Sequence, residues 1–387
     1  MVAQKKIRVT FCIPIMIIGG VETVFVNTLN ELLTNKNLEI KIISHGKITE
    51  PLYVDWLKSH PEVPVYVYYP LHDFFEELQK YCKIFPLKQI RKIIYSLYKK
   101  YRRLLVRIFH KYSDTDIFID YKNLEFFKEF RQINKPKIGW FHCAISYCEN
   151  NHLFSRLPIY DKFVCITDDF LNEFKKKVPE RSNDIVRIYN SVDPAAIQDK
   201  ALSGQRSSEK YFCHVSRLAD GKDLKTVFDA FEIFAKQHND IKLFVVGDGP
   251  KASEFKKYAS KLKSSKQIVF WGSLDNPFGL MHGAIANILS SEHEGFGMVP
   301  VESMALASLI ICSNYKCGAR EILEDGQNGL LFDIGNAPML AKCMSDALDN
   351  QIKEKKIQRA YKSLSRFSVN KTTKQIIDLL QSFGGNK

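Results

Sequence analysis

The chain has 387 residues, of which 45% are hydrophobic and 26% are charged, and its net charge is +13. These are ordinary globular values, and the length favours two domains over one. No apolar run approaches the roughly 20 residues that span a bilayer. The nine cysteines include no C-x-x-C pair, which argues against a zinc ribbon and predicts reduced cytosolic thiols.

The N-terminus has a basic stretch, Lys5–Arg8, ahead of the apolar stretch Val9–Ile18, and this order imitates a signal peptide. No obvious cleavage site follows, and an apolar helical pattern continues as far as Leu32. We therefore predict a buried strand, a tight turn at Gly19-Gly20 and a helix.

Apolar runs of strand length alternate with longer helical patterns, which favours parallel sheets built from βα units. The strands predicted before residue 197 are Arg8–Pro14, Glu39–Ser44, Asp116–Asp120, Lys137–Phe141 and Lys162–Thr167. Residues 198–210 are polar and are interpreted as a linker. Beyond them we predict strands Tyr211–Ser216, Lys242–Val246, Gln267–Trp271, Ile285–Leu289 and Leu309–Cys312, and helices Leu224–His238, Lys251–Lys263 and Pro300–Leu306. The predicted fold class is α/β, with two Rossmann-like domains, 1–197 and 198–367, whose parallel sheets face a central cleft.

Residues 78–113 contain eleven basic residues and no acidic one. Apolar side chains recur there at spacings of three and four, from Leu87 to Tyr112, which predicts a helix with an apolar stripe beside a basic face. Such a helix suits an anionic membrane surface. The alternative is a packed helix with a solvated basic face. Nucleic acid is not expected as a partner, because no recognised nucleic-acid motif accompanies the charge.

The stretch 290–302 carries two carboxylates, Glu294 and Glu302, on either side of a glycine-rich turn that leads into a helix predicted to begin near Pro300. Backbone N–H groups at a helix start are unpaired and form an anion site. Carboxylates around such a site suit a ligand with hydroxyls at each end and phosphates in the middle, as in a sugar nucleotide. The alternative for the two glutamates alone is a loop with two solvated acids.

Further polar residues follow predicted strands. Arg217 and Lys222 lie beyond the carboxyl end of the strand Tyr211–Ser216, where ligands of open α/β sheets bind, and both would reach a diphosphate there. His142 ends the strand Lys137–Phe141 and is predicted to face the cleft, although a lone histidine is more often structural. Asp114-Thr115-Asp116 has the spacing of a D-x-D metal motif, but it precedes a strand, so we interpret it as a turn.

Together these motifs resemble those of the family-4 retaining glycosyltransferases of the GT-B fold. Glu294–Glu302 is similar to the family's E-x7-E pattern. The supporting elements, in matching order, are Gly19–Glu22, Ile188–Asp193, Ser216–Leu218 with Lys222, Gly247–Pro250 and Gly326–Leu331. Two elements depart from the family pattern. Ser191 replaces the usual glycine, and Cys317–Glu321 replaces a pattern with Pro or Gly-Gly before the late glutamate.

The resemblance implies a role for each matching residue. Glu294 would hold hydroxyls of the donor sugar, His142 would contact the transferred sugar, and Arg217 and Lys222 would neutralise the diphosphate; these four form the expected catalytic set. Glu302 would bind the ribose hydroxyls. Further donor contacts are expected from Gly20, Gly272, Leu274, Gly295, Phe296, Gly297 and Met298. A final helix at 368–387 would cross back to the first domain.

The predicted function is that of a retaining hexosyltransferase, located in the cytoplasm and peripheral at the inner face of the cell membrane. It would move a hexose from a UDP-hexose to a glycan or glycolipid acceptor in cell-envelope saccharide synthesis, without a metal ion or other cofactor. One alternative is a GT-B epimerase that acts on the sugar nucleotide. Another is a non-catalytic glycolipid-binding subunit, against which the intact polar set argues.

Overall fold

The computed structural model describes residues 6–14, 16, 20–67, 96, 97, 100 and 114–383. The chain forms two compact units, which are described separately. The first contains the residues up to Cys165, then Val178–Val186, and the residues from Thr373 on; the second contains Ile166–Lys177 and Arg187–Thr372. Most of the basic stretch 78–113 lies outside the described residues. Of the helices that are described, none is long and apolar enough to cross a bilayer.

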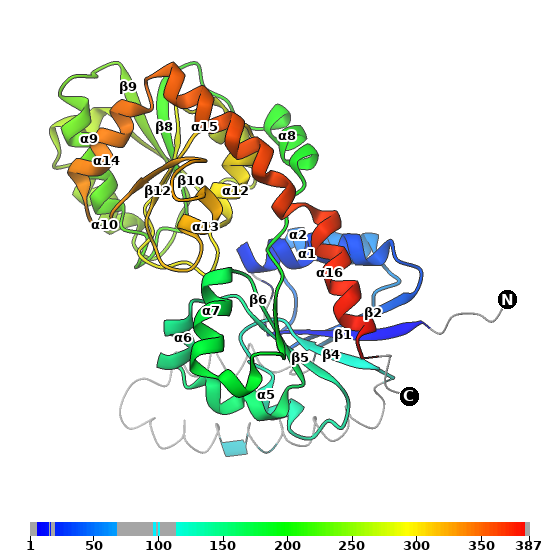
Figure 1. Ribbon diagram of the computed structural model, residues 1–387. Coiled ribbons are helices and arrows are strands. Elements are labelled where there is room, and N and C mark those ends of the chain that lie inside the picture. Colours follow the sequence, from blue (N-terminus) through cyan, green and yellow to red (C-terminus); the bar gives the residue numbers. More distant parts are fainter. Residues whose placement is uncertain are drawn as a thin grey trace. The chain divides into compact units, whose positions relative to one another are not determined.

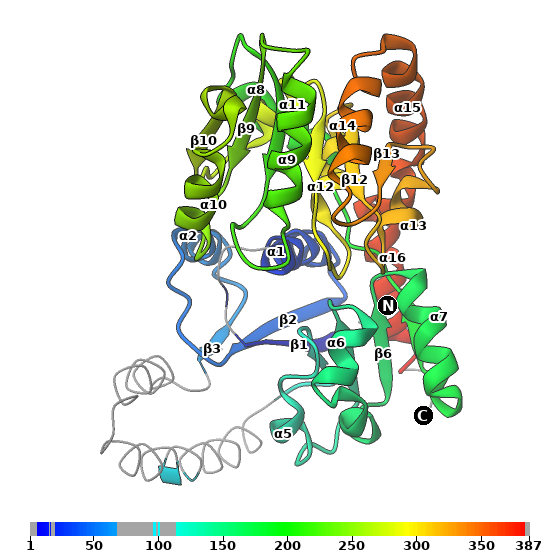
Figure 2. The ribbon, with the colours of Figure 1, turned by 90° about the vertical axis from the view of Figure 1, so that its left-hand side faces the viewer.

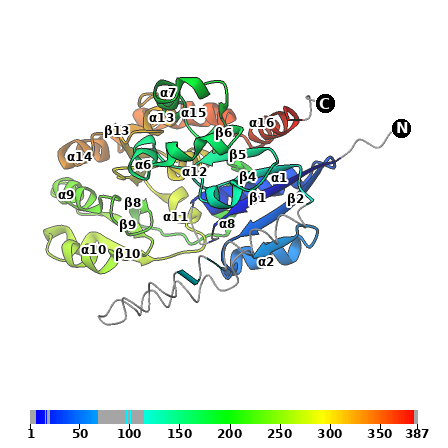
Figure 3. The ribbon, with the colours of Figure 1, turned by 90° about the horizontal axis from the view of Figure 1, so that it is seen from below.

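The first unit is built on a seven-stranded sheet with the strand order β3-β2-β1-β4-β5-β6-β7, and Figure 3 shows β2, β1, β4, β5 and β6 following one another in that order. Neighbouring strands from β3 to β6 pair in parallel, as Figure 2 shows for β1 and β2. The strands are β1 (Ile7–Ile13), β2 (Leu38–Ser44), β3 (Val65–Val67), β4 (Ile117–Asp120), β5 (Lys137–Phe141), β6 (Lys162–Cys165) and β7 (Ile185–Arg187). The helices that come before β6 are α1 (Gly20–Leu33), α2 (Pro51–Ser59), α5 (Phe127–Phe130) and α6 (Ile145–Asn150).

The second unit is built on a six-stranded parallel sheet with the order β10-β9-β8-β11-β12-β13. Its strands are β8 (Lys210–Val215), β9 (Ile241–Val246), β10 (Ile268–Gly272), β11 (Asn287–Leu289), β12 (Ile310–Ser313) and β13 (Leu330–Phe332). Its helices are α7 (Asp168–Lys177), α8 (Pro194–Ser203), α9 (Leu224–Ala235), α10 (Ala252–Ala259), α11 (Phe278–Gly283), α12 (Met298–Ala305), α13 (Ala319–Leu323), α14 (Ala337–Asp346) and α15 (Asn350–Ser363). Helix α16 (Val369–Gln381) begins in this unit and continues into the residues of the first.

Alternating side chains of the strands form the core of the second unit on both faces of the sheet. In β8, Phe212 packs into a cluster with α9, α10 and α14, whereas Tyr211 and Cys213 pack into a second cluster with α8 and α11. Figure 1 shows α9, α10 and α14 on one side of this sheet and α8 and α12 on the other. Because helices cover both faces, the strands are nearly continuous apolar runs, which is the pattern that predicted them.

Both sheets change direction at their first strand. In the first sheet, β2 and β3 lie on one side of β1, and β4 lies on the other side. In the second sheet, β9 and β10 lie on one side of β8, and β11 lies on the other side. Ligands of such sheets bind outside the carboxyl ends of the strands at this switch point. In the second unit the switch point lies between the ends of β8 and β11, and the loops that follow these strands carry the predicted donor residues.

The structure confirms the α/β class and the two parallel sheets, but it corrects two details. Residues 198–210 are not simply a linker, because α8 occupies Pro194–Ser203 and packs on α11 and α12. For the same reason the boundary between the units falls at Arg187, ahead of the predicted 197/198, and α7 joins the second unit although it precedes that boundary. From Thr373 on, the chain groups with the first unit.

Candidate active site

Two loops meet at the switch point of the second unit. One follows β8 and ends at Asp223, whose side chain caps α9 by accepting the N–H of Thr226. The other follows β11 and ends at α12. The Ser290 hydroxyl donates to the carbonyl of Lys222 at 2.6 Å, and the Glu292 N–H donates to the carbonyl of Gly221 at 2.8 Å. These two bonds fix the loops against each other, so the side chains of one are held in register with those of the other.

An ion pair joins the two loops. The ammonium group of Lys222 lies 2.5 Å from Glu294 Oε1, and the Ser291 hydroxyl donates to the same oxygen at 2.6 Å. Both charged side chains are about one-fifth exposed, at 23% and 19%. The structure therefore brings together a predicted diphosphate ligand, Lys222, and the predicted sugar ligand, Glu294. Arg217 lies on the first loop, where it is exposed and has no ion pair within the described part of the chain.

The glycine-rich turn Gly295–Gly297 leads into α12, which begins at Met298 and so starts two residues before the predicted Pro300. Gly297 has a φ of +89°, and a Cβ there would lie 2.2 Å from the Tyr315 hydroxyl, so glycine is required on both counts. That hydroxyl donates to the carbonyl of Phe296 at 2.7 Å and fixes the turn from behind. Gly297 offers no side-chain cap to the helix, so the first N–H groups of α12 remain available to an anion.

Glu302 lies one turn into α12, where it is partly buried. Burial raises the pKa of its carboxyl group to about 7, and the nearby Lys200 opposes this shift in part. At neutral pH this group is therefore divided between its neutral and ionised forms. A carboxyl group of this kind can hydrogen-bond uncharged hydroxyls without adding a full negative charge beside phosphates.

The neighbouring strand ends are closely packed. The Gly247 N–H donates to the carbonyl of Gly272 at 2.7 Å, and a Cβ on Gly247 would lie 1.8 Å from the carbonyl oxygen of Ser216. Glycine at 247 thus lets β9 and the loop after β8 approach each other. Leu274, two residues beyond Gly272, packs against the cluster around α8 and α11. The prediction that Gly272 and Leu274 lie near the donor base is not tested by these contacts.

The other two predicted site residues belong to the first unit. Gly20 begins α1 and is exposed. His142 follows β5, and its backbone N–H donates to Asn123 Oδ1 at 2.8 Å. Its ring lies against Tyr121, with centroids 4.6 Å apart, and its two ring nitrogens are buried without a hydrogen-bond partner among the described residues. Burial, with a smaller contribution from Lys122, lowers the pKa of His142 to about 3, so its imidazole is neutral at physiological pH.

The polar groups around the switch point of the first sheet were not predicted as a set. Lys122 follows β4 and lies 2.7 Å from Glu22 Oε1 on α1, and Glu22 is buried. Asp120 ends β4 and accepts hydrogen bonds from the Tyr160 hydroxyl and the Phe126 N–H, at 2.7 and 2.8 Å. Burial raises the pKa of Asp120 to about 8. In the sequence, the only indication of this group of polar residues was the position of Asp120 at the end of a predicted strand.

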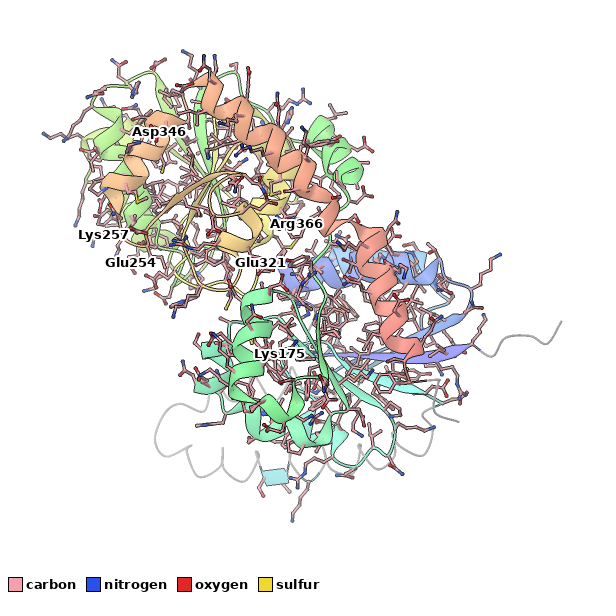
Figure 4. The ribbon with its side chains drawn as sticks, in the orientation of Figure 1. Lys175, Glu254, Lys257, Glu321, Asp346 and Arg366 are labelled. Atoms are coloured by element: carbon pink, nitrogen blue, oxygen red, sulfur yellow. The ribbon has the colours of Figure 1, made fainter. Side chains whose placement is uncertain are left out.

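Glu321 was not predicted either, although the sequence drew attention to the stretch before it. Its carboxylate accepts the N–H of Asp168 at 2.9 Å and so caps α7, and Arg366 donates to its carbonyl at 3.1 Å (Figure 4). Asp168 in turn accepts from Arg187 and from the Tyr189 hydroxyl, at 3.0 and 3.1 Å. This network ties α7 to the second unit.

The D-x-D stretch has a structural role. Asp114 and Asp116 lie ahead of β4, at the amino end of the sheet, and both pair with Arg8. Their position agrees with the interpretation as a turn. Among the described residues no group of three or more His, Cys, Asp or Glu side chains is arranged to hold a metal ion.

Comparison with known proteins shows what these residues are similar to. Residues 197–364 match the family model of the glycosyl transferases group 1. The chain is 28% identical over 179 residues to N-acetylgalactosamine-N,N'-diacetylbacillosaminyl-diphospho-undecaprenol 4-alpha-N-acetylgalactosaminyltransferase of Campylobacter jejuni, a match that covers 46% of this chain and 47% of that protein. It is 28% identical over 160 residues to the lipopolysaccharide 1,6-galactosyltransferase of Salmonella typhimurium, covering 40% of this chain and 43% of that one.

Among solved structures, HepE of Anabaena in complex with UDP-glucose superposes with a TM-score of 0.73 at 18% identity, over 97% of this chain and 99% of that one. This likeness extends over both units and shows the fold. The chain spans about half the length of the curated relatives it matches. The family model covers residues 197–364, which include the Lys222–Glu294 pair and the glycine-rich turn. The chain thus has the GT-B fold, and its residues 197–364 match the family model of the glycosyl transferases group 1.

Proposed function

We propose that the chain is a retaining glycosyltransferase that moves a hexose from a UDP-hexose to a glycan or glycolipid acceptor in cell-envelope saccharide synthesis. The observation that carries this proposal is the junction of the two loops of the second unit. Cationic side chains, a glycine-rich turn and the start of α12 lie there beside Glu294 and Glu302. This set offers positive potential for a diphosphate and carboxyl groups for the hydroxyls on either side of it.

In the proposed reaction the acceptor oxygen forms a bond to the anomeric carbon while the bond from that carbon to the diphosphate oxygen breaks. The attack comes from the face that the diphosphate leaves, and the departing phosphate oxygen takes the acceptor's proton. Arg217, Lys222 and the first N–H groups of α12 stabilise the charge that grows on the leaving group. Because they supply this positive potential, the reaction needs no metal ion, and activity should survive chelation of divalent metals.

The names of the relatives support the acceptor class. The Campylobacter protein is named for a diphospho-undecaprenol substrate and the Salmonella protein for lipopolysaccharide, and HepE was solved with UDP-glucose. On these grounds we favour a lipid-linked acceptor and a uridine donor. The basic stretch 78–113 would hold the enzyme at the inner face of the membrane, where each basic residue near an anionic surface contributes about 1 kcal/mol.

The test is to incubate the purified protein with UDP-hexoses, with and without an acceptor lipid. We expect transfer only when both are present, and an α-linked product if the donor is α-linked, as nuclear magnetic resonance of the anomeric proton would show. Formation of an epimeric sugar nucleotide without acceptor would instead identify an epimerase. Binding of acceptor lipid without any turnover of donor would identify a non-catalytic subunit.

The membrane part of the proposal has its own test. Changing Lys99, Lys100, Arg102 and Arg103 to Glu should weaken binding to vesicles that contain anionic lipid, while transfer to a short soluble acceptor survives. Unchanged vesicle binding, or wild-type binding that high salt does not weaken, would contradict a membrane role for this stretch.

A further inference from the structure

We propose that Cys143 and Cys148 are a peroxide-sensitive thiol pair that closes to a reversible disulfide beside His142. Their sulfur atoms lie 3.5 Å apart, about 1.5 Å further than the ~2.05 Å of bonded sulfurs. The two side chains must therefore approach each other by about this distance for a bond to form. The effect on transfer described below rests on the proposed function, whereas the bond itself does not.

The two residues lie on one short structural segment. Cys143 is in the turn that follows β5, and Cys148 is on α6, with the Tyr147 N–H bonded to the carbonyl of Ala144 in the first turn of that helix at 3.1 Å. Helix α6 therefore turns the later cysteine back towards the earlier one. The segment is also held at its start, because Asn123 accepts the backbone N–H of His142.

The two thiols differ in exposure, and this difference sets the order of events. Cys143 is partly exposed, whereas Cys148 is fully buried. A hydroperoxide reaches Cys143 first, because oxidation of a thiol follows its access to solvent. A buried neighbour in contact with it is then the resolving thiol, as in known redox-sensing pairs.

The chemistry balances with one hydroperoxide. The Cys143 thiolate attacks one peroxide oxygen, the O–O bond breaks, and a sulfenic acid and water (from hydrogen peroxide) result. The Cys148 thiolate then attacks the sulfenic sulfur, the S–O bond breaks, the S–S bond forms, and the hydroxide leaves as water with the released proton. Two thiols are oxidised by two electrons in all, and the peroxide is reduced to two water molecules. A dithiol reductant reverses the bond.

Closing the bond moves the turn that carries His142. Cys143 is the next residue in the chain, so a shift of its Cβ is transmitted to the His142 backbone, which Asn123 and the ring of Tyr121 now hold in place. Misplacement of a site residue by about 1 Å can cost 10²-fold in rate. We expect oxidation to lower transfer by roughly tenfold or more, with recovery after reduction.

Peptide mapping tests the bond directly. Cleavage after Lys137 and Arg156 yields a single tryptic peptide, Ile138–Arg156, that contains both cysteines. After the folded protein is treated with hydrogen peroxide and then alkylated, we expect this peptide to lose two hydrogen atoms and to take up no alkyl group. Dithiothreitol should restore two alkylation sites. A peptide that is still alkylated at both cysteines would overturn the proposal.

Variants and a matched pair sharpen the test. Cys148→Ser should leave Cys143 as a sulfenic acid that dimedone captures, and Cys143→Ser should leave Cys148 unreactive because it is buried. Cys312 and Cys317 have the same spacing in sequence, but the Cys312 thiol contacts the Ser313 carbonyl at 3.4 Å, so this pair should stay reduced. Pairing of Cys312 with Cys317 to the same extent would show that spacing alone, and not the observed contact, governs oxidation.

Measuring transfer activity alongside the peptide mass separates the proposed disulfide from the proposed glycosyltransferase function. The mass of the peptide reports the disulfide whether or not transfer is observed, so failure of the proposed glycosyltransferase activity leaves this measurement intact. If the disulfide forms and transfer is unchanged, the link to His142 is wrong. If wild type and Cys143→Ser lose transfer equally in peroxide, the loss arises elsewhere and the link is again wrong.

Discussion

The two sheets of this molecule have the same strand pattern at their switch points but opposite chemistry there. In the second unit the loops after β8 and β11 carry Arg217 and the Lys222–Glu294 pair, all at least partly exposed. In the first unit the ends of β4 and β5 carry Asp120 and His142, which burial holds in their uncharged forms, with pKa values of about 8 and about 3. The same topology therefore carries partly exposed charged groups in the second unit, whereas in the first it carries the buried, uncharged Asp120 and His142 beside the Lys122–Glu22 ion pair.

We interpret this difference in terms of the two substrates of the proposed reaction, the donor and the acceptor. A diphosphate is a strongly charged group that binds cations and free N–H groups, and Arg217, Lys222 and the start of α12 supply both at the switch point of the second unit. An acceptor hydroxyl is uncharged, and a neutral imidazole can hydrogen-bond it without itself carrying a desolvated charge. We therefore propose that the donor binds to the second unit and the acceptor to the first, and the predictions below test this assignment.

The largest expected effect is at the charged site. Replacing Arg217 or Lys222 with Ala should lower turnover by about a hundredfold or more, because charge-assisted contacts strengthen as the leaving group develops charge. Steady-state kinetics would measure the loss and thermal unfolding would confirm the fold. Lys225→Ala is the matched control, since Lys225 lies three residues further on and pairs with Glu254 on the surface. Near-normal turnover in both site variants would remove the diphosphate assignment.

The two carboxylates of the charged site should respond differently. Glu294→Gln should lower turnover by roughly tenfold or more while free nucleoside diphosphate still binds, because the transferred sugar changes shape in the transition state. Glu302→Gln should mainly weaken the binding of donor and of free diphosphate, because the ribose does not change. Kinetics and calorimetry on both variants provide the comparison. Loss of free diphosphate binding in Glu294→Gln, with full binding in Glu302→Gln, would reverse the assignment.

The glycine turn that supports the charged site should show a smaller effect, on stability. Gly297→Ala places a Cβ against the Tyr315 hydroxyl at positive φ, whereas Gly335→Ala has a φ of +75° with nothing within 4 Å. We expect the first to lower the free energy of unfolding by about 1–3 kcal/mol more than the second, the difference being the cost of the overlap. Chemical denaturation of both variants measures it. Equal losses would mean that backbone conformation alone requires glycine at 297.

The neutral site should show its effect in the pH dependence of stability. Because the pKa of Asp120 is raised from 3.8 to about 8, the folded state binds its proton more tightly than the unfolded state, so this group's contribution to stability falls as pH rises from about 4 to about 8. Asp120→Asn removes this titration while keeping an acceptor oxygen. The difference in unfolding free energy between variant and wild type should therefore shift in favour of the variant over that range. A difference that is independent of pH would mean that Asp120 is ionised.

Sequence reasoning identified most of the buried strands but missed several short or polar elements. The strands β1, β5 and β9 were predicted to within about a residue, because both of their faces are buried and the apolar run is continuous. The strands β3 and β13 have three residues each and show no measurable period. Helix α8 was taken for a linker because its surface is polar, although Asp193 before Pro194 is a recognisable cap and first-turn signal.

The residues of the candidate site were more predictable than their contacts. Motifs located Lys222 and Glu294, but their ion pair joins positions that are 72 residues apart, and no local pattern predicts such a contact. The pKa of His142 was also out of reach, because it depends on Tyr121, Lys122 and the surrounding core. The sequence thus identified polar side chains at the ends of strands. Which of them are charged depends on how they are packed in the folded chain.

The cap that Glu321 provides for α7 has a consequence during synthesis. The capped Asp168 precedes Glu321 by 153 residues, and at roughly 5–20 residues per second a ribosome needs on the order of ten seconds to make that interval. Throughout this time α7 has left the ribosome without the carboxylate that completes its first turn. The first unit waits still longer, since it also includes the residues from Thr373 on. Neither unit is therefore complete until these later residues have been made, and a nascent chain stalled before Glu321 should expose α7 to chaperones and proteases.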